Sequence, residues 1–186
     1  MVRRASVKDS PWHLCVGGFK LKAPYDVESL LGEVMRAVSP HLAQLFDADM
    51  VAGWEHLYLA TVNAVRAFQS GYNIARSLSM EVLLYVSCRD QIAEAIRLVG
   101  VSSETERAAL LVLAEDEEEC LKAYGRASRL LGEEDDSLLE VDEAKLRRLM
   151  ELHEISEEEV EAIGGPRAEA VTLLLVERGA LIPAMR

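Results

Sequence analysis

The amino-acid sequence predicts an α+β fold, with a small antiparallel or mixed sheet of three to four strands that packs with about seven to eight helices. Three observations lead to this prediction. Short runs of β-forming and apolar residues occur at three places in the chain. Longer segments between and after these runs repeat apolar residues at helical spacing. The strands are separated by groups of helices and do not alternate with single helices, as they would in a parallel sheet.

The predicted strands lie at residues 12–21, 41–46 and 108–114. The first, WHLCVGGFKL, mixes β-forming residues with the pair Gly17-Gly18, which suggests a bulge or a bend. The last, AALLVLA, is a short uninterrupted apolar run, so its length favours a buried strand over a helix. Together these segments predict the sheet.

The predicted helices begin and end at capping signals. Asp26 is placed to cap the first helix, and Gly71 stands where the C-cap glycine of the second belongs. Asp116 opens a run of acids that favours the positive end of a helix dipole, and Ser156-x-x-Glu159 has the form of a capping box. The helices are predicted at residues 26–38, 49–68, 116–131, 142–152, 156–163 and 167–178, with two more between 73 and 100.

The segment 73–100 begins with a densely apolar helix that carries one polar stripe. The polar residues recur at every fourth position and so share one face of the helix; they are Asn73, Ser77, Glu81, Tyr85 and Arg89. This stripe has two interpretations. It is either a solvent-facing edge held by hydrogen bonds between successive turns or a contact surface for a partner.

A second helix follows after a tight connection. Ser87-x-x-Asp90 has the form of a capping box at its start, and Gly100 is predicted to be its left-handed C-terminal residue. The apolar face of this helix is expected to consist of Ile92, Ala95, Ile96 and Val99. The pattern therefore predicts a short amphipathic helix that packs on the core.

The size of the chain, 186 residues of which 50% are apolar, predicts a single domain over residues 1–186, with residues 1–11 as a candidate flexible tail. No apolar run is long enough to span a membrane, and the first residues lack the apolar core of a secretory signal. We therefore expect a cytoplasmic protein without membrane contacts.

The chain contains three cysteines, Cys15, Cys88 and Cys120. Their number is odd and none lie at CxxC spacing, which predicts buried reduced thiols and no metal site.

The net charge of −12 argues against nucleic-acid binding at first, because phosphates repel an acidic protein. The charge is unevenly distributed, however. Residues 1–100 carry ten Lys or Arg and ten Asp or Glu, whereas residues 101–186 carry ten and twenty-two. The neutral first part leaves room for a local basic contact with RNA. The alternative is a solvated acidic surface without a nucleic-acid role.

The common catalytic and nucleotide-binding signatures are missing from the sequence: GxxxxGK[ST], GxGxxG after a strand, HExxH and GxSxG do not occur. The four histidines also lie far apart in the chain. We therefore expect a binding protein rather than an enzyme, with no catalytic residues, no cofactor and no small-molecule substrate. An unrelated enzyme on an α+β scaffold is the rival interpretation, and no motif supports it.

A small candidate contact surface contains two arginines and one aromatic residue. Arg76 and Arg89 supply positive charge, and Tyr85 offers a ring on which a base could stack for about 1–3 kcal/mol. A site of this size suits a short single-stranded RNA end better than a duplex, which needs a longer basic track. The complete candidate set for RNA or partner contact is Asn73, Arg76, Ser77, Tyr85, Arg89, Gln91 and Lys20.

Several motifs, taken in order, resemble the KEOPS accessory-subunit family that includes the PRPK-binding protein. They span most of the chain from about residue 42 to the end, and their order and spacing make the resemblance specific. The motifs are Phe46-Asp47-Ala48-Asp49-x-Val51-Ala52-Gly53-x-x-His56-Leu57, Asn73-x-Ala75-Arg76-Ser77-x-x-x-Glu81-x-Leu83-Leu84-Tyr85-x-Ser87, Gln91-Ile92-x-x-Ala95-Ile96-x-x-x-Gly100, Asp135-Asp136-Ser137-x-Leu139-Glu140 and Val176-Glu177-Arg178-x-Ala180-Leu181.

This resemblance implies a non-catalytic subunit of the complex that makes threonylcarbamoyladenosine beside the anticodon of tRNA. It implies that the chain binds and activates the small atypical kinase of that complex and recruits tRNA through its single-stranded 3′ CCA end. The alternative is a kinase-binding activator without RNA affinity of its own, which the acidic charge favours. The chain departs from the family where Cys88 replaces a frequent glycine and Arg89 lies one residue before the usual arginine.

Overall fold

A computed structural model describes residues 2–22 and 24–185. Its centre is a five-stranded sheet in which all paired strands are antiparallel. The strands are β1 (Arg3–Ser6), β2 (His13–Leu21), β3 (Leu42–Asp47), β4 (Arg107–Ala114) and β5 (Gly132–Glu134). They are ordered β1-β2-β4-β3, and β5 pairs with the end of β2. The α+β prediction is confirmed, although the sheet has one strand more than the four expected.

β2 and β4 form the middle of the sheet and carry side chains into two separate cores. Leu14 pairs with Leu113 and Val16 with Leu111, and these four residues belong to one core cluster. Val112, between Leu111 and Leu113, belongs to the cluster on the other face. Because successive side chains of a strand point to opposite faces, the continuous apolar run of β4 is buried on both sides.

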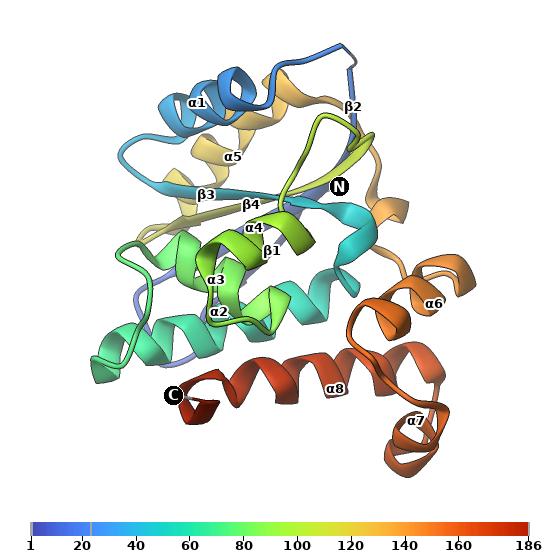
Figure 1. The fold of residues 1–186 in the computed structure, drawn as a ribbon. Coiled ribbons are helices and arrows are strands. Elements are labelled where there is room, and N and C mark those ends of the chain that lie inside the picture. The colour runs from blue at the N-terminus through green and yellow to red at the C-terminus, as the bar shows by residue number, and fades with distance from the viewer. Residues whose placement is uncertain (1, 23, 186) are drawn as a thin grey trace.

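Helices cover both faces of the sheet. The described residues form α1 (Val27–Val38), α2 (Gly53–Ser70), α3 (Leu78–Ser87), α4 (Ile92–Val99), α5 (Glu117–Leu131), α6 (Glu143–Leu152), α7 (Glu157–Ile163) and α8 (Arg167–Ala180). α1 and α5 lie on one face, and α2, α3 and α4 lie on the other (Figure 1). α8 runs beside α2 on the side away from the sheet, with α6 and α7 next to it (Figure 1).

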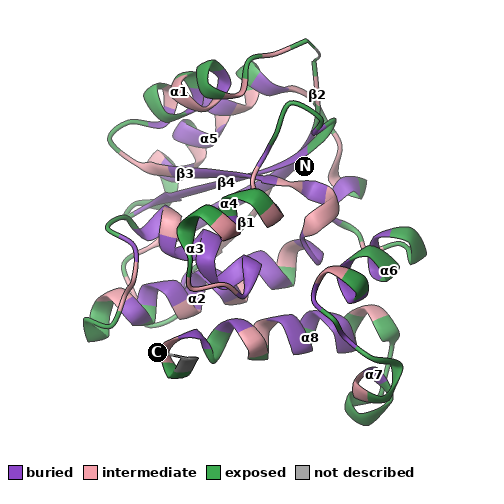
Figure 2. Cartoon of the chain, viewed as in Figure 1, coloured by how far each residue is buried: buried purple, intermediate pink, exposed green. Residues whose placement is uncertain are grey.

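α3 is the most enclosed helix of the fold. It packs against α2, α4, α8 and β3, and Figure 2 shows it buried over most of its length. By contrast, α1, α6 and α7 keep exposed outer faces (Figure 2). A helix in this position needs apolar residues all round, which is why the sequence of α3 is densely apolar.

Several predicted helix ends are confirmed by their hydrogen bonds. Asp26 and Asp116 each accept a hydrogen bond from a backbone N–H in the first turn of α1 and α5. Gly71 is the left-handed C-cap of α2, with φ of 74°. Ser156 and Glu159 form the predicted capping box of α7. These ends were predictable because each cap depends on residues that are neighbours in the sequence.

The start of the chain differs from its prediction. Residues 1–11 are expected from the sequence to be a flexible tail, but Arg3–Ser6 form β1, which pairs with β2 from Arg3 opposite Val16 to Ser6 opposite His13. β5 was likewise not expected. Both strands are short and polar, so only the presence of β2 beside them makes them strands.

The pair Gly17-Gly18 does not form the predicted bulge. Both glycines continue the regular ladder between β2 and β4, opposite Leu110 and Ala109. Neighbouring groups explain the glycines instead. The Tyr124 ring occupies the space beside Gly17, and a Cβ atom on Gly18 would lie 2.6 Å from the carbonyl oxygen of Asp135. Glycine is required here by close approach rather than by chain bending.

The helix starts in segments 49–68 and 73–100 also differ from their predictions. Ala48–Met50 form a short 3-10 turn, so α2 begins at Gly53 rather than at Asp49. α3 begins after Ser77 rather than at Asn73, because Ser77 is its N-cap. The side chains before Ser77 therefore lie in a loop and do not share the helix face predicted for them.

The predicted connection between α3 and α4 is wrong in detail. Ser87 is the last residue of α3 and is buried, so it does not form a capping box with Asp90. Cys88 is the C-cap in the left-handed conformation, with φ of 55°. Gln91 precedes α4 without a side-chain cap. Gly100 has φ of −76° and is not a left-handed stop; a Cβ atom there would lie 2.6 Å from a backbone oxygen of α4.

The apolar face of α4 is only partly buried. Ala95 and Val99 lie in the core, whereas Ile92 and Ile96 are 38% and 46% exposed. The sequence predicts that all four residues face inward. α4 is short and lies on the outside of α3, so it buries a narrow stripe of its surface.

Candidate binding surfaces

The polar stripe predicted within segment 73–100 does not form a contact surface. Glu81 and Tyr85 are only 1% and 3% exposed, while Asn73 and Ser77 lie before α3 and Arg89 lies after it. Tyr85 therefore offers no ring to an RNA base, and burial raises the pKa of its hydroxyl group. The stripe fails because the elements packed around α3 leave it almost no exposed face.

Glu81 instead shapes the loop between α2 and α3. Its Oε2 atom accepts hydrogen bonds from the backbone N–H groups of Ile74 and Ala75 at 2.9 and 2.6 Å. The Nδ2 of Asn73 donates to the carbonyl oxygen of Ala75 at 2.9 Å. The Oγ of Ser77 accepts a hydrogen bond from a backbone N–H in the first turn of α3. Polar residues predicted to contact a partner thus hold the loop that carries Arg76.

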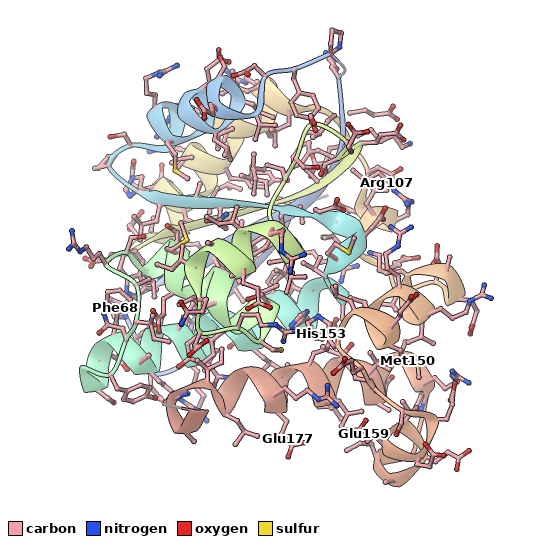
Figure 3. All side chains as sticks on the ribbon, in the orientation of Figure 1. Phe68, Arg107, Met150, His153, Glu159 and Glu177 are labelled. Carbon is pink, nitrogen blue, oxygen red and sulfur yellow. The ribbon has the colours of Figure 1, made fainter. Side chains whose placement is uncertain are left out.

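Arg76 stands at the rim of a hollow of about 330 Å³, which we call the Arg76 hollow. Its lining consists of Trp12, Leu42, Val65, Phe68, Gln69, Arg76, Ser77 and Leu78. Arg76 is exposed, and no described residue forms an ion pair with it. Phe68, which lines this hollow, lies near the end of α2 (Figure 3). The hollow therefore combines a free guanidinium group with two half-buried aromatic rings.

The aromatic residues of the Arg76 hollow were not among the predicted site residues. Trp12 and Phe68 fit the patterns of a strand and a helix, so the sequence assigns them to elements and not to a site. Their positions at the ends of two predicted elements are the only local signal of exposure. Which other residues meet at those ends depends on the tertiary fold.

The remaining predicted site residues lie apart from the Arg76 hollow. Arg89 pairs with Glu94 at 3.0 Å. Gln91 is exposed at the start of α4. Lys20 pairs with Asp135 at 2.8 Å near the end of β2, about 25 Å along the strand direction from Trp12. Of the seven predicted residues, only Arg76 and Ser77 line this hollow.

A second surface lies between α2 and α8, and we call it the α2–α8 groove. It consists of two hollows of about 450 and 390 Å³ that share Leu59 and Leu173. One wall is lined by residues between 52 and 66, in and just before α2, and the other by residues between 168 and 180 of α8. Leu173 is 51% exposed at its centre. The sequence predicts both helices but not the groove, because their contact is a tertiary feature.

Two buried histidines, His56 and His153, lie where α2 and α6 meet α8. The Nδ1 of His56 accepts a hydrogen bond from the backbone N–H of Ala52 at 3.1 Å. Burial lowers the pKa of His56 to about 3 and that of His153 to about 4. Figure 3 shows His153 in the interior beside α8. The groups are neutral near neutral pH, which suits packing rather than proton transfer.

No metal site is formed by the described residues. Within residues 2–22 and 24–185, no group of three or more His, Cys, Asp or Glu side chains could hold a metal ion. Cys15, Cys88 and Cys120 are buried and unbridged, as the sequence predicts. None of the described helices combines the length and the apolar character needed to cross a bilayer.

A protein-family model described as "Kinase binding protein CGI-121" matches residues 27–168, which is most of the chain. The chain belongs to the CGI-121 family. It is also 34% identical over 112 residues to "Regulatory protein Cgi121" of Methanocaldococcus jannaschii, an alignment that covers 60% of this chain and 70% of the relative. The family predicted from the sequence motifs is thereby confirmed.

The CGI-121 match covers part of the Arg76 hollow but not the centre of the α2–α8 groove. It includes Phe68 and Arg76 of the Arg76 hollow but not Trp12, which precedes residue 27. It ends at the start of α8, so Leu173 at the centre of the α2–α8 groove lies beyond it. The family assignment alone therefore does not identify either surface as a binding site. Only the geometry of the chain locates the two surfaces.

Proposed function

We propose that the chain is a non-catalytic regulatory subunit that binds and activates a small kinase in the cytoplasmic KEOPS assembly for threonylcarbamoyladenosine modification of tRNA. The descriptions of the CGI-121 family as kinase-binding and of the M. jannaschii relative as regulatory support the kinase part. The α2–α8 groove is the observation that carries it. Large exposed apolar depressions mark contact sites on proteins, and Leu173 places a half-exposed leucine in the middle of this one.

Copurification with the cognate small kinase tests this proposal. Leu173→Asp is expected to weaken the complex at least tenfold, roughly the effect of placing an unpaired carboxylate in an apolar contact. It should also abolish the rise in ATP hydrolysis by the kinase. The matched control is Leu130→Asp, at a leucine that is 39% exposed on α5, on the opposite face of the sheet. Wild-type binding by Leu173→Asp would remove the groove as the docking site.

We further propose that the Arg76 hollow takes the single-stranded 3′ CCA end of tRNA. The rings of Trp12 and Phe68 can stack on bases, for roughly 1–3 kcal/mol per base. Because no described residue forms an ion pair with Arg76, its guanidinium can contact a phosphate group without breaking such a pair. A hollow lined by one arginine and two aromatic residues suits a short RNA end, because a duplex requires a longer basic track.

Gel-shift titration with tRNA and with tRNA that lacks its CCA end tests this second proposal. We expect tighter binding of the intact tRNA and a loss of affinity of about tenfold or more in Trp12→Ala. Arg76→Glu should weaken binding as well, whereas Arg36→Glu, at an exposed arginine of α1, should not. Equal binding of both RNAs would contradict the 3′-end proposal. No binding of either RNA would support a kinase-binding activator without RNA affinity, as the net charge of −12 favours.

A further inference from the structure

The two ends of the α2–α8 groove carry opposite charge. Near the starts of α2 and α8 the rim contains Glu55, Glu140 and Glu169, with Arg3 as a single cation. Further along both helices the rim contains Lys8 and Arg66, with Glu177 as a single anion. The two helices run in the same direction, so their first turns lie at one end of the groove and their later turns at the other. The net charge of the rim is therefore negative at the first end and positive at the second.

These rim charges are available to a partner. Within residues 2–22 and 24–185, none of the seven side chains has an ion-pair partner. Glu55 and Glu169 lie in the first turns of their helices, where a carboxylate favours the helix dipole. The helix dipole explains why Glu55 and Glu169 occur at these positions, but both carboxylates still face solvent at the groove.

The floor between the charged ends is apolar and has the length of a short helix. Leu59 and Leu173 form its middle, and Val62 and Val176 continue it toward the basic end. The eleven residue steps from Glu55 to Arg66 span about 16 Å along α2, or three helical turns. An amphipathic helix laid in such a groove buries one apolar stripe and leaves its flanking charges over the rims.

We propose that the α2–α8 groove receives an amphipathic helix of the kinase whose charge is complementary to that of the groove. The end of this helix over Glu55, Glu140 and Glu169 is basic, and the end over Lys8 and Arg66 is acidic. This inference rests on the proposed kinase-binding function and adds a direction to it. Because the two ends of the groove carry opposite charge, they favour one orientation of the partner helix. The reversed orientation is opposed, because like charges would then face each other.

Binding of the intact kinase to charge-reversed variants tests this orientation. Glu169→Lys and Arg66→Glu are each expected to weaken the complex roughly fivefold at about 50 mM salt, because exposed charge pairs contribute up to about 1 kcal/mol. The loss should shrink at about 500 mM salt, where screening is stronger. The matched control is Glu33→Lys, at an exposed residue of α1 on the opposite face of the sheet, which should bind like the wild type.

The outcomes separate this inference from the function on which it rests. If Leu173→Asp weakens binding but either charge reversal leaves it unchanged or tightens it, the groove is the docking site and the inferred charge pattern is wrong. If Leu173→Asp binds like the wild type, both the groove and the charge pattern are wrong. If the kinase does not bind the wild-type chain at all, the proposed function itself fails.

Discussion

The carboxylate of Glu81 accepts a hydrogen bond of 2.6 Å from the backbone N–H of Ala75. The two residues are six positions apart, and their contact fastens the loop after α2 to the buried helix α3. The Arg76 hollow depends on this loop, because Arg76 follows Ala75 directly. The buried acid thus connects the stability of the core to the shape of a candidate binding surface.

Replacement of Glu81 should therefore be destabilising. Glu81→Ala removes the acceptor of two backbone N–H groups, that of Ala75 buried and that of Ile74 half-buried, so we expect a loss of about 2–3 kcal/mol in the free energy of unfolding. Glu81→Gln keeps an acceptor oxygen and should lose less. Urea unfolding provides the measurement. Glu94→Ala, at a partly exposed acid paired with Arg89, is the control and should change stability by about 0.5 kcal/mol or less.

The stability of the chain should fall as the pH is lowered from 7 to 5. Burial depresses the pKa of His56 to about 3 and that of His153 to about 4 in the folded state, against about 6.5 in the unfolded chain. Because only the unfolded state takes up protons in this window, each histidine should remove about 2 kcal/mol from the free energy of unfolding. Urea unfolding at several pH values measures this loss, and a flat profile would contradict it.

The close approach of Tyr124 to Gly17 predicts a specific steric effect. Gly17→Ala places a methyl group against the Tyr124 hydroxyl group and should destabilise the fold by about 1–3 kcal/mol. Tyr124→Phe removes the hydroxyl group, and its combination with Gly17→Ala should lose less than the sum of the single changes. Thermal or urea unfolding of the four proteins checks this.

Gly125→Ala provides the matched control for the glycine prediction. Gly125 lies inside α5, and apart from the adjoining backbone of α5 itself no described atom is within 4 Å of the position that a Cβ would take. Alanine is the better helix former, so this variant should gain about 0.5–1 kcal/mol. A similar destabilisation by both alanine variants would show that steric contact with Tyr124 is not the cause.

Cys88 should be unreactive toward alkylating reagents in the native protein. It is 4% exposed, and burial raises the pKa of its thiol group to about 12. Its Sγ donates a hydrogen bond to the carbonyl oxygen of Leu175 at 3.2 Å, which ties the end of α3 to α8. Because the thiolate is the reactive form, alkylation followed by mass spectrometry should modify Cys88 only after unfolding. Rapid native labelling would contradict the burial of this residue.

The sequence predictions were correct where they depended on interactions between residues close in the sequence, and wrong where they depended on tertiary packing. Asp26, Gly71 and Ser156 were predicted correctly as helix caps, since the atoms they bond belong to nearby residues. The polar stripe through Glu81 and Tyr85 was wrong, because spacing reveals that residues share a helix face but not what covers that face. The same limit explains why Ile92 and Ile96 were expected inside and lie partly outside.

The sequence by itself determined the fold class, most of the helices, the three longest strands and the family of this protein, because periodicity, caps and motif spacing are local properties of the chain. Only the tertiary structure decided where the candidate binding surfaces lie. Trp12, Phe68 and Arg76 line one hollow, and Leu59 and Leu173 line another, only after distant segments pack together. Polar residues such as Glu81 can serve the core or a partner, and the packing around them determines which role they take.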